Sequence, residues 1–299
     1  MNSDNIEITV VAPAMNEELN IKLFFESCLQ AEKTIGKNIE IVFIDDGSTD
    51  QTLYEMQSLK FDHGEKIQII KHLTNLGITR SLKDGFDRSL GQFVVWLPTD
   101  LECNPSEDLP KLYDKYLEGY HVISGSRLNR GDGKLLASEV YNFVSRKLFG
   151  IQSTDLNWIK GFDKVCLKDL TLRGDWHRFM LHELHTKGYN LGEVPVNWYK
   201  RKHGISKFGR KRFLTSITDV LGVWFILSFR DRPMRFFGSI FLFTILIGVA
   251  LQSALVVLYL QQNTQIRPLL SLSFYIQGFG IASLYTGFIA ELIANNGHK

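Results

Sequence analysis

The sequence predicts an α/β domain built on a parallel sheet, followed by an amphipathic segment and two membrane-spanning helices. In the first two hundred residues, short runs rich in Val, Ile and Phe alternate with stretches whose apolar residues recur at helical spacing. The strand-like runs are residues 6–12, 39–44, 67–71 and 93–97, and the helical stretches are 20–35, 49–59 and 78–90. Such alternation is typical of a parallel sheet covered by helices on both faces. Ligands bind these sheets at the carboxyl ends of the strands, so a functional site is expected in the loops there.

The composition argues against a nucleic-acid-binding protein and against a disulfide-rich one. The 299 residues include 34 Lys and Arg and 32 Asp and Glu, a formal net charge of +2, whereas nucleic-acid binding calls for a strongly basic surface. The three cysteines are far apart and form no metal-binding or disulfide pattern, which fits a reducing compartment. Residues 1–7 lack the basic start and apolar core of a secretory signal. The N-terminal domain is therefore expected in the cytoplasm.

Two long stretches without charge predict membrane spans. Residues 236–260 and 269–290 contain no charged side chain, and each supplies the roughly twenty apolar residues that cross a bilayer core of about 30 Å. A buried helix of a soluble protein is the alternative, and two such stretches in succession make it the weaker one. Arg230, Arg232 and Arg235 precede the first span. Because positive charge marks the cytoplasmic side, both termini are predicted to face the cytoplasm.

The segment before the spans is basic and then amphipathic. Residues 213–229 are apolar apart from Asp219 and follow a cluster of basic residues, which suits a helix lying in the membrane interface. A domain helix with one solvated face is the alternative. The basic cluster comprises Arg201, Lys202, Lys207, Arg210, Lys211 and Arg212. The predicted divisions are a cytoplasmic domain at 1–208, a juxtamembrane region at 209–235 and two transmembrane helices within 236–293.

Acidic residues follow the first, second and fourth strand-like runs. Residues 13–18 read PAMNEE and residues 45–50 read DDGSTD. Carboxylates at a strand end can accept hydrogen bonds from a base or a ribose, although Thr49 and Asp50 could equally cap the next helix. The adjacent pair Asp45 and Asp46 repel each other and call for a ligand or other partners.

The fourth run is followed by a pair of carboxylates suited to a divalent cation. Asp100 and Glu102 are two residues apart, so in extended chain they point the same way. Mg²⁺ usually takes one or two carboxylates together with phosphate oxygens. The pair therefore predicts a Mg²⁺ or Mn²⁺ site shared with the diphosphate of a bound nucleotide.

Together these motifs resemble the inverting family 2 glycosyltransferases, which have a nucleotide-diphospho-sugar transferase (GT-A, Rossmann-like) fold. Each motif alone is weak, but their order and spacing are specific. They are PxxNEE at 13–18, DDGSTD at 45–50, NxG at 75–77 followed by Ser81 and Gly85, and DLE at 100–102. Three further elements are similar to those of dolichol-phosphate mannose synthases and bacterial polyprenyl-phosphate glycosyltransferases: GSR at 125–127, GDWHRF at 174–179 and RxxGxSKF at 201–208. With the two spans, the resemblance covers nearly the whole chain.

The resemblance implies roles for individual residues on the nucleotide side. Asp100 and Glu102 fall where the family binds its metal. The family often has Asp-x-Asp-x-Gln there, whereas this chain has Pro98 in place of the first Asp and Glu102 in place of Gln. The predicted nucleotide-binding residues are Pro13, Asn16, Glu17, Asp45, Asp46 and Asp100.

On the acceptor side, the resemblance places Arg127 at the acceptor phosphate, and Arg201, Ser206 and Lys207 complete the predicted phosphate site. A phosphate monoester carries nearly two negative charges at pH 7, so it needs positioning and positive charge rather than a general base. The predicted catalytic residues are Asp100, Arg127, Arg201 and Lys207. Asp155, His177 and Arg178 are further candidates, for which packing and salt bridges within the domain are the alternative.

The resemblance thus predicts an inverting sugar transferase that acts on undecaprenyl or dolichyl phosphate at the inner (plasma) membrane for cell-envelope glycan modification. UDP-glucose or UDP-N-acetylglucosamine is the expected donor, with GDP-mannose as the alternative, and the branch implies a homo-oligomer, a tetramer. One competing interpretation is transfer to diacylglycerol or ceramide, which would require a base such as Asp175 and leave Arg127 dispensable. Another is an inactive membrane scaffold, which the loss of an aspartate at Pro98 would favour.

Overall fold

The computed structural model describes residues 6–128, 146–151, 153–174, 176–201, 212–262 and 267–296. The chain divides into two compact units, Met1–Val220 and Leu221–Lys299, which are described separately. The three-part division expected from the sequence remains a prediction.

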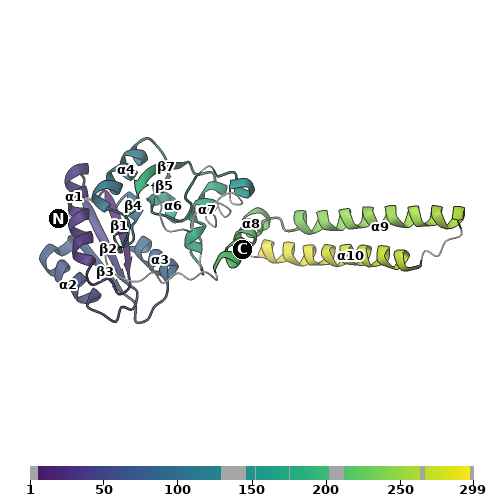
Figure 1. Ribbon diagram of the computed structural model, residues 1–299, viewed down its shortest axis with the longest axis horizontal. Coiled ribbons are helices and arrows are strands. Elements are labelled where there is room, and N and C mark those ends of the chain that lie inside the picture. Colours follow the sequence, from purple (N-terminus) through teal and green to yellow (C-terminus); the bar gives the residue numbers. More distant parts are fainter. Residues whose placement is uncertain are drawn as a thin grey trace. The chain divides into compact units, whose positions relative to one another are not determined.

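The first unit is built on a seven-stranded sheet with the strand order β3-β2-β1-β4-β6-β5-β7 (Figure 1). The strands are β1 (Ile8–Ala14), β2 (Ile39–Asp45), β3 (Ile67–Lys71), β4 (Phe93–Trp96), β5 (Val122–Leu128), β6 (Lys160–Asp163) and β7 (Leu191–Asn197). The first four are parallel, as predicted, and the expectation of a wholly parallel sheet is wrong beyond them. β6 runs antiparallel to both β4 and β5, and it leads directly into a short helix instead of crossing over the sheet.

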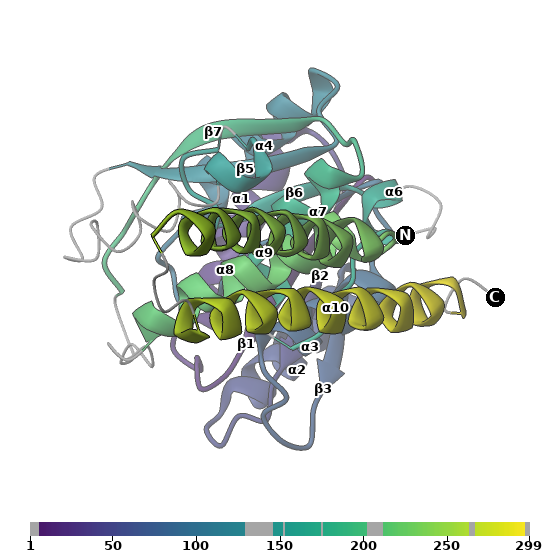
Figure 2. The ribbon, with the colours of Figure 1, turned by 90° about the vertical axis from the view of Figure 1, so that its right-hand side faces the viewer.

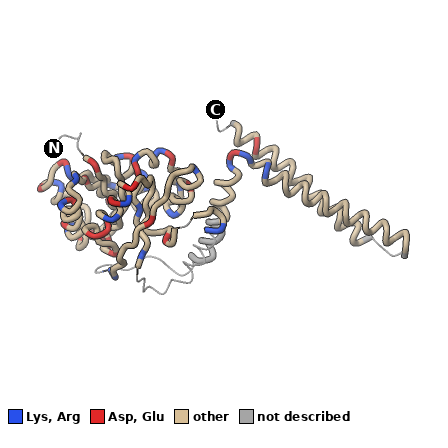
Figure 3. The backbone as a smooth tube through the Cα atoms, turned by 90° about the horizontal axis from the view of Figure 1, so that it is seen from above, with Lys and Arg blue, Asp and Glu red and all other residues tan. Residues whose placement is uncertain are grey.

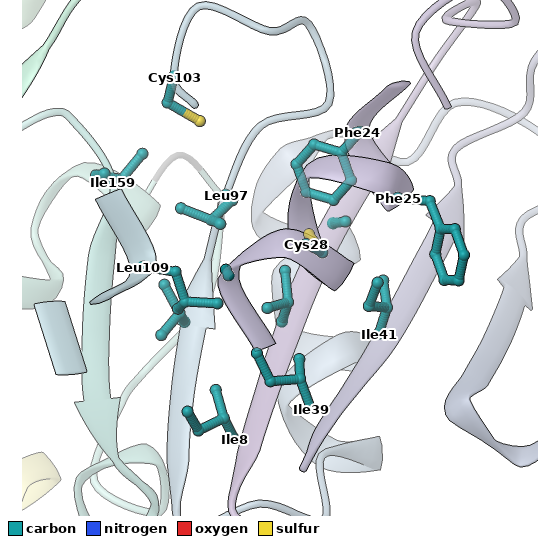
Figure 4. Packing of buried hydrophobic residues seen from close by; sticks show 14 of the residues in the cluster. Ile8, Phe24, Phe25, Cys28, Ile39, Ile41, Leu97, Cys103, Leu109 and Ile159 are labelled. Carbon is teal, nitrogen blue, oxygen red and sulfur yellow. The ribbon is translucent and has the colours of Figure 1, made fainter. Parts of the chain in front are cut away.

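Alternating side chains of the central strands pack against helices on the two faces of the sheet. On one face, helices α1 (Ile21–Ile35) and α4 (Pro105–Leu117) cover the strands, and Phe24, Cys28 and Leu109 belong to the same buried cluster as Ile41 of β2 (Figure 4). On the opposite face lies α3 (Ile78–Arg88). A Cβ atom at Gly85 of α3 would lie 2.4 Å from Cγ1 of Val11, so this glycine allows the helix to approach the sheet closely.

Short elements complete this unit. They are α2 (Thr52–His63), the 3-10 turns η2 (Gly64–Lys66) and η3 (Trp176–Arg178), and helices α6 (Lys164–Leu167) and α7 (Met180–Thr186). In the strand order, β1 leads outward to β2 and β3, and the chain then returns to place β4 on the other side of β1. A crevice at the carboxyl ends of β1 and β4 is where a sheet of this topology binds ligands.

The second unit contains the C-terminal half of helix α8 (Arg212–Phe229) and all of α9 (Met234–Gln262) and α10 (Arg267–Asn296). α9 and α10 run side by side (Figure 2), and almost no charge interrupts either of them (Figure 3). Both are long and apolar enough to cross a membrane. Most residues of each span are exposed, unlike those of a core helix in a soluble protein.

Small and polar residues hold α9 and α10 together. A Cβ atom at Gly280 would lie 2.1 Å from Oγ1 of Thr244, so the helices approach closely there, as small residues allow in membrane helix pairs. The amides of Gln252 and Gln277 donate to each other across the pair at 3.3 Å. At one end, the backbone N–H of Met234 donates to the carboxylate of Glu291 at 3.0 Å.

Candidate functional site

The loops after β1 and β2 are joined by hydrogen bonds at the carboxyl edge of the sheet. Asn16 has a φ of 57°, a left-handed conformation that Asn tolerates better than most residues. Its backbone N–H donates to Oγ of Ser48 at 3.0 Å, and its side-chain oxygen accepts from the backbone N–H of Thr49 at 2.8 Å. The backbone N–H of Glu17 donates to Oγ1 of Thr52 at 2.8 Å. The two predicted nucleotide-binding motifs therefore form one surface.

Pro13 and Asp45 lie within strands rather than after them. β1 and β2 remain paired through Ala14 and Asp45, so the expectation that both residues belong to loops is wrong by one or two positions. The pairing persists because the residues before Asp45 are largely apolar and almost all buried on both strands. Asp45 still lies at the carboxyl end of β2, where its Oδ1 accepts from the backbone N–H of Ser48 at 3.0 Å.

Asp46 is buried and already has three partners. Its Oδ1 accepts from the backbone N–H of Leu76 at 2.8 Å, and its Oδ2 accepts from the backbone N–H of Gly77 at 3.0 Å. Nδ1 of His72 lies 2.8 Å from Oδ1. The predicted need of this carboxylate for partners is thus met by the chain itself, largely by the turn between β3 and α3.

Asp50 serves both the loops and the first turn of α2, which begins at Thr52. Its Oδ1 accepts from the backbone N–H and the hydroxyl of Thr52 at 3.0 and 2.6 Å, and its Oδ2 accepts from the backbone N–H of Glu18 at 3.3 Å. The residue that precedes α2 is Gln51, which makes no side-chain cap. The capping role expected of Thr49 or Asp50 is thus filled by Asp50, which satisfies the first backbone N–H of α2 from the position before Gln51.

Asp100 and Glu102 converge on one cation, which is Arg201. The Arg201 guanidinium donates from NH2 to Oδ2 of Asp100 at 2.5 Å and from Nε to Oε1 of Glu102 at 2.8 Å. The chain between the two acids is not extended as predicted, because Leu101 has a φ of 58°. The turn at Leu101 nevertheless directs both carboxylates to the same point. Burial raises the pKa of Asp100, and the positive charge of Arg201 opposes that rise.

The two carboxylates fit a divalent cation of the kind that keeps several ligands from its substrate. Two oxygens that share one guanidinium are close enough to face one metal ion, and Mg²⁺ takes one or two carboxylates plus phosphate oxygens. In the ranges that the structure describes, no group of three or more His, Cys, Asp or Glu side chains could hold a metal ion. The donor set therefore suits a metal held jointly with a diphosphate better than one held by protein alone.

Arg127 lies on β5, toward the side of the sheet opposite β3. Its side chain forms an ion pair with Asp155. Its Nε and NH2 donate to the two carboxylate oxygens of Asp155 at 2.6 and 3.0 Å, and its guanidinium stacks 4.5 Å from the ring centroid of Trp158. Both side chains of the ion pair are only about a tenth exposed, at 9% and 11%. Among the predicted phosphate-binding residues, Arg201 thus joins the acidic pair and Arg127 joins Asp155, while Ser206, Lys207 and the alternative base Asp175 lie outside the described residues.

A fully buried lysine lies beneath this pair. Nζ of Lys160 on β6 donates to the backbone oxygen of Trp158 at 2.8 Å and lies 5.1 Å from the ring centroid of Trp96. Burial lowers the pKa of Lys160 to about 7, and the charge of Arg127 also lowers it while that of Asp155 raises it. Sequence reasoning missed Lys160, because a lysine in a four-residue strand carries no pattern that marks it as buried.

The GDWHRF element packs beside the start of α3. Nδ1 of His177 lies 2.8 Å from Oγ1 of Thr79, and its ring meets Trp96 at the end of β4 edge-on, with centroids 6.5 Å apart. Of the further candidates, His177 therefore lies beside Trp96 at the end of β4, and Asp155 forms the ion pair with Arg127.

Comparison with known proteins matches the part of the chain that holds these motifs. A sequence model of the family described as glycosyl transferase family 2 matches residues 9–178. The dodecaprenyl-phosphate galacturonate synthase of Rhizobium johnstonii is 28% identical, over 99% of this chain and 90% of that protein. The undecaprenyl-phosphate 4-deoxy-4-formamido-L-arabinose transferase of Pectobacterium carotovorum is 27% identical, over 74% of this chain and 68% of that protein.

Solved structures match the fold over about three quarters of the chain. The glucosyl-3-phosphoglycerate synthase of Mycobacterium tuberculosis, in complex with Mg²⁺ and uridine diphosphate, superimposes with a TM-score of 0.54. The match covers 73% of this chain and 80% of that chain, at 18% identity. A complex of the same protein with Mn²⁺, uridine diphosphate and glucosyl-3-phosphoglycerate gives a TM-score of 0.52.

Proposed function

Because the chain belongs to glycosyl transferase family 2, we propose that it transfers a sugar from a nucleotide-sugar to a polyprenyl phosphate at a membrane. The predicted family, the GT-A fold and the assignment as a glycosyltransferase are confirmed. The single observation that carries the proposal is the convergence of Asp100, Glu102 and Arg201 at the carboxyl end of β4. There, carboxylates for a metal and a cation for a phosphate meet, in a chain with two helices long enough to cross a membrane.

The proposed acceptor follows from the chemistry of the site and from the relatives. The two relatives carry dodecaprenyl phosphate and undecaprenyl phosphate in their names. The dianionic phosphate is already a nucleophile, so the chain must place it and balance its charge. Arg201 and Arg127, with Ser206 and Lys207, are the residues proposed to do so. Attack on the sugar from the face opposite the leaving nucleotide inverts the anomeric centre.

On the donor side, Pro13, Asn16, Glu17, Asp45 and Asp46 are proposed to bind the nucleotide. Asp100 and Glu102 would hold Mg²⁺ or Mn²⁺ together with the diphosphate, and such an ion stabilises charge on a departing diphosphate. The preference for glucose or N-acetylglucosamine remains a prediction. The names of the relatives contain galacturonate and 4-deoxy-4-formamido-L-arabinose, so the donor panel must include acidic and amino-modified sugars.

At the membrane, α9 and α10 are proposed to span the bilayer with both termini in the cytoplasm, and α8 is proposed to lie in the interface. Arg230 and Arg232, which precede α9, and Arg235 in its first turn are exposed, as expected for side chains at the head-group layer. Assembly into a homo-oligomer, a tetramer, is proposed from the resemblance to the polyprenyl-phosphate branch.

The test is release of nucleoside diphosphate by the full-length protein in nanodiscs, with Mg²⁺ and a panel of UDP- and GDP-sugars. We expect release from one donor that depends on undecaprenyl phosphate and is absent with undecaprenol, which has the same tail without the phosphate. Release that depends on diacylglycerol or ceramide instead would assign the other lipid acceptor. No release with any donor would support the inactive scaffold and overturn the proposal.

A further inference from the structure

The turn between β3 and α3 is fastened by one histidine. His72 follows β3 and is buried, and its backbone N–H donates to the backbone oxygen of Asp45 at 2.9 Å. Its Nδ1 lies 2.8 Å from Oδ1 of Asp46, and its Nε2 lies 3.1 Å from Oδ2 of Asp84 on α3. His72 thus connects the end of β2 to the first helix after the turn.

Both ring nitrogens of His72 face carboxylate oxygens. A neutral imidazole donates from one nitrogen only, and the lone pair of the other would then face a negative oxygen. The shorter contact is the one to Asp46, which fits a proton on Nδ1. Asp84 also accepts from Nε of Arg80 at 2.7 Å, so a cation stabilises the carboxylate on the helix side.

The contact with Asp46 sets the direction of a carboxylate that faces the donor site. A carboxylate offers about four acceptor positions, and three protein donors already occupy Asp46, namely the backbone N–H groups of Leu76 and Gly77 and Nδ1 of His72. About one acceptor position of Asp46 remains for a ligand. The direction in which this position points depends on how the three donors orient the carboxylate.

Beyond the bonds to Asp46, polar contacts of Asn75 hold this turn: its Oδ1 accepts from the backbone N–H of Gly77 at 2.9 Å, and its Nδ2 lies 2.7 Å from Sδ of Met15. Leu73 is 92% exposed and Leu76 is 52% exposed, so apolar burial contributes little to the position of the turn. The turn also touches the DDGSTD motif, because a Cβ atom at Gly47 would lie 2.6 Å from the carbonyl carbon of Thr74. A displacement of the turn would therefore be passed to the residues beside Asp46.

We propose that His72 is a positioning residue of the donor site, which fixes the Asp46 carboxylate and the 74–77 turn so that Asp46 can accept a hydrogen bond from the nucleotide. This inference rests on the proposed function, in which Asp46 binds the nucleotide. The bond to Asp46 is the one that matters for the ligand, and the bond to Asp84 orients the ring.

Two substitutions separate the two bonds. The amide nitrogen of Asn lies about where Nδ1 of His does, and that of Gln about where Nε2 does, so His72→Asn keeps a donor for Asp46 and His72→Gln keeps one for Asp84. We measure the binding of UDP and of GDP, with Mg²⁺, to the full-length protein by titration calorimetry. His72→Asn should bind the preferred nucleotide within about threefold of wild type. His72→Gln should bind it about tenfold more weakly, as expected for loss of a hydrogen bond to a charged group.

The matched control is Asp87→Asn, which removes an exposed carboxylate paired with Lys83 on the same helix and should leave binding unchanged. Thermal melting of all variants separates positioning from stability. Equal losses in the Asn and Gln variants, or losses that follow only their melting temperatures, would overturn the positioning role. So would a His72→Gln protein that binds as wild type does. Failure of wild type to bind either nucleotide would contradict the proposed function instead.

Discussion

On the proposed donor side, at the ends of β1, β2 and β3, the buried carboxylate of Asp46 takes two of its three hydrogen bonds from backbone N–H groups. On the proposed acceptor side, around β5, β6 and β7, Arg127 and Asp155 pair side chain to side chain near the buried Lys160. Backbone donors depend on the path of the chain, whereas side-chain pairs depend on both residue identities. Substitutions should therefore act through loop shape on the donor side and through unbalanced charge on the acceptor side.

The largest effect is expected at the Arg127–Asp155 pair. Removal of one partner leaves the other charge buried and unpaired, which costs about 3–5 kcal/mol, while replacing both by apolar residues of similar size is often nearly neutral. Asp155→Leu should thus unfold at lower denaturant, and the double variant Arg127→Met with Asp155→Leu should recover most of that stability. If Arg127 holds the acceptor phosphate, nucleoside diphosphate release by the double variant should stay at least about a hundredfold below wild type.

If the double variant is as stable as wild type, any loss of its transferase activity cannot be due to unfolding. Denaturation and acceptor-dependent turnover are measured on the same preparations. A stable double variant that transfers sugar at the wild-type rate would restrict Arg127 to a structural role and leave the acceptor phosphate to Arg201, Ser206 and Lys207.

The next effect, on the donor side, comes from loop shape. Gly47 has a φ of +74°, and a Cβ atom there would lie 2.6 and 2.7 Å from backbone atoms of Thr74 and Asn75. Gly36 has a similar φ of +70°, with nothing within 4 Å of its Cβ position. Gly36→Ala should cost only the left-handed strain of about 1 kcal/mol, while Gly47→Ala should cost about 3 kcal/mol because the turn must also move. Chemical denaturation gives both values.

Binding of UDP by the same two variants tests the link between the turn and the ligand. Gly47→Ala should weaken it and Gly36→Ala should not. Similar stabilities and affinities for the two variants would mean that the turn adapts freely, and the donor side would then be less dependent on loop shape than the geometry implies.

A similar contrast, between local chain order and contacts over long sequence distances, explains which strands and site residues could be predicted from the sequence. β1 to β4 were predictable because each is a short run rich in apolar residues. The acids after β1, β2 and β4 were predictable because the ends of parallel strands lie at one edge of the sheet. β6 was not, since it has four residues and its first is Lys160. The partners of Asp100 and Glu102 were beyond local reasoning too, because Arg201 lies 101 and 99 residues away in the sequence.

A motif could locate Arg201 but not its contacts. The resemblance assigned it to the acceptor phosphate, and the structure pairs it with both predicted metal ligands. His72 escaped notice for a different reason. A single histidine after a strand has no spacing that marks a function, and only the positions of Asp46 and Asp84 reveal that both of its nitrogens are engaged.

A third and smaller effect is expected at Lys160, where substitution should raise the free energy of unfolding instead of lowering it. The folded pKa of about 7 lies below the value of 10.5 for an exposed lysine, so the unfolded chain binds more protons between these values. Stability should therefore rise with pH from about 7 to 10.5, and the burial penalty should be greatest below pH 7. Lys160→Met removes the charge with similar volume. It should stabilise the protein by about 2 kcal/mol at pH 7 and flatten this part of the stability profile, as measured by denaturation at a series of pH values. An unchanged slope would mean that the amine is solvated or paired in solution.

The smallest effect is expected at Glu193 of β7, which bonds to the residue before Asp155. Its Oε1 accepts from the backbone N–H and the hydroxyl of Thr154 at 2.9 and 2.5 Å, and Thr154 directly precedes Asp155. Glu193→Gln keeps one acceptor oxygen but loses the charge, so each bond weakens without being lost. The free energy of unfolding should fall by about 1 kcal/mol, and the acceptor KM should rise about threefold while the donor KM stays constant.

Glu118→Gln, at an exposed residue paired with Lys115, is the matched control and should change neither the free energy of unfolding nor the acceptor KM. A rise in the donor KM for Glu193→Gln would show that the two sides of the site are coupled through the sheet rather than held independently.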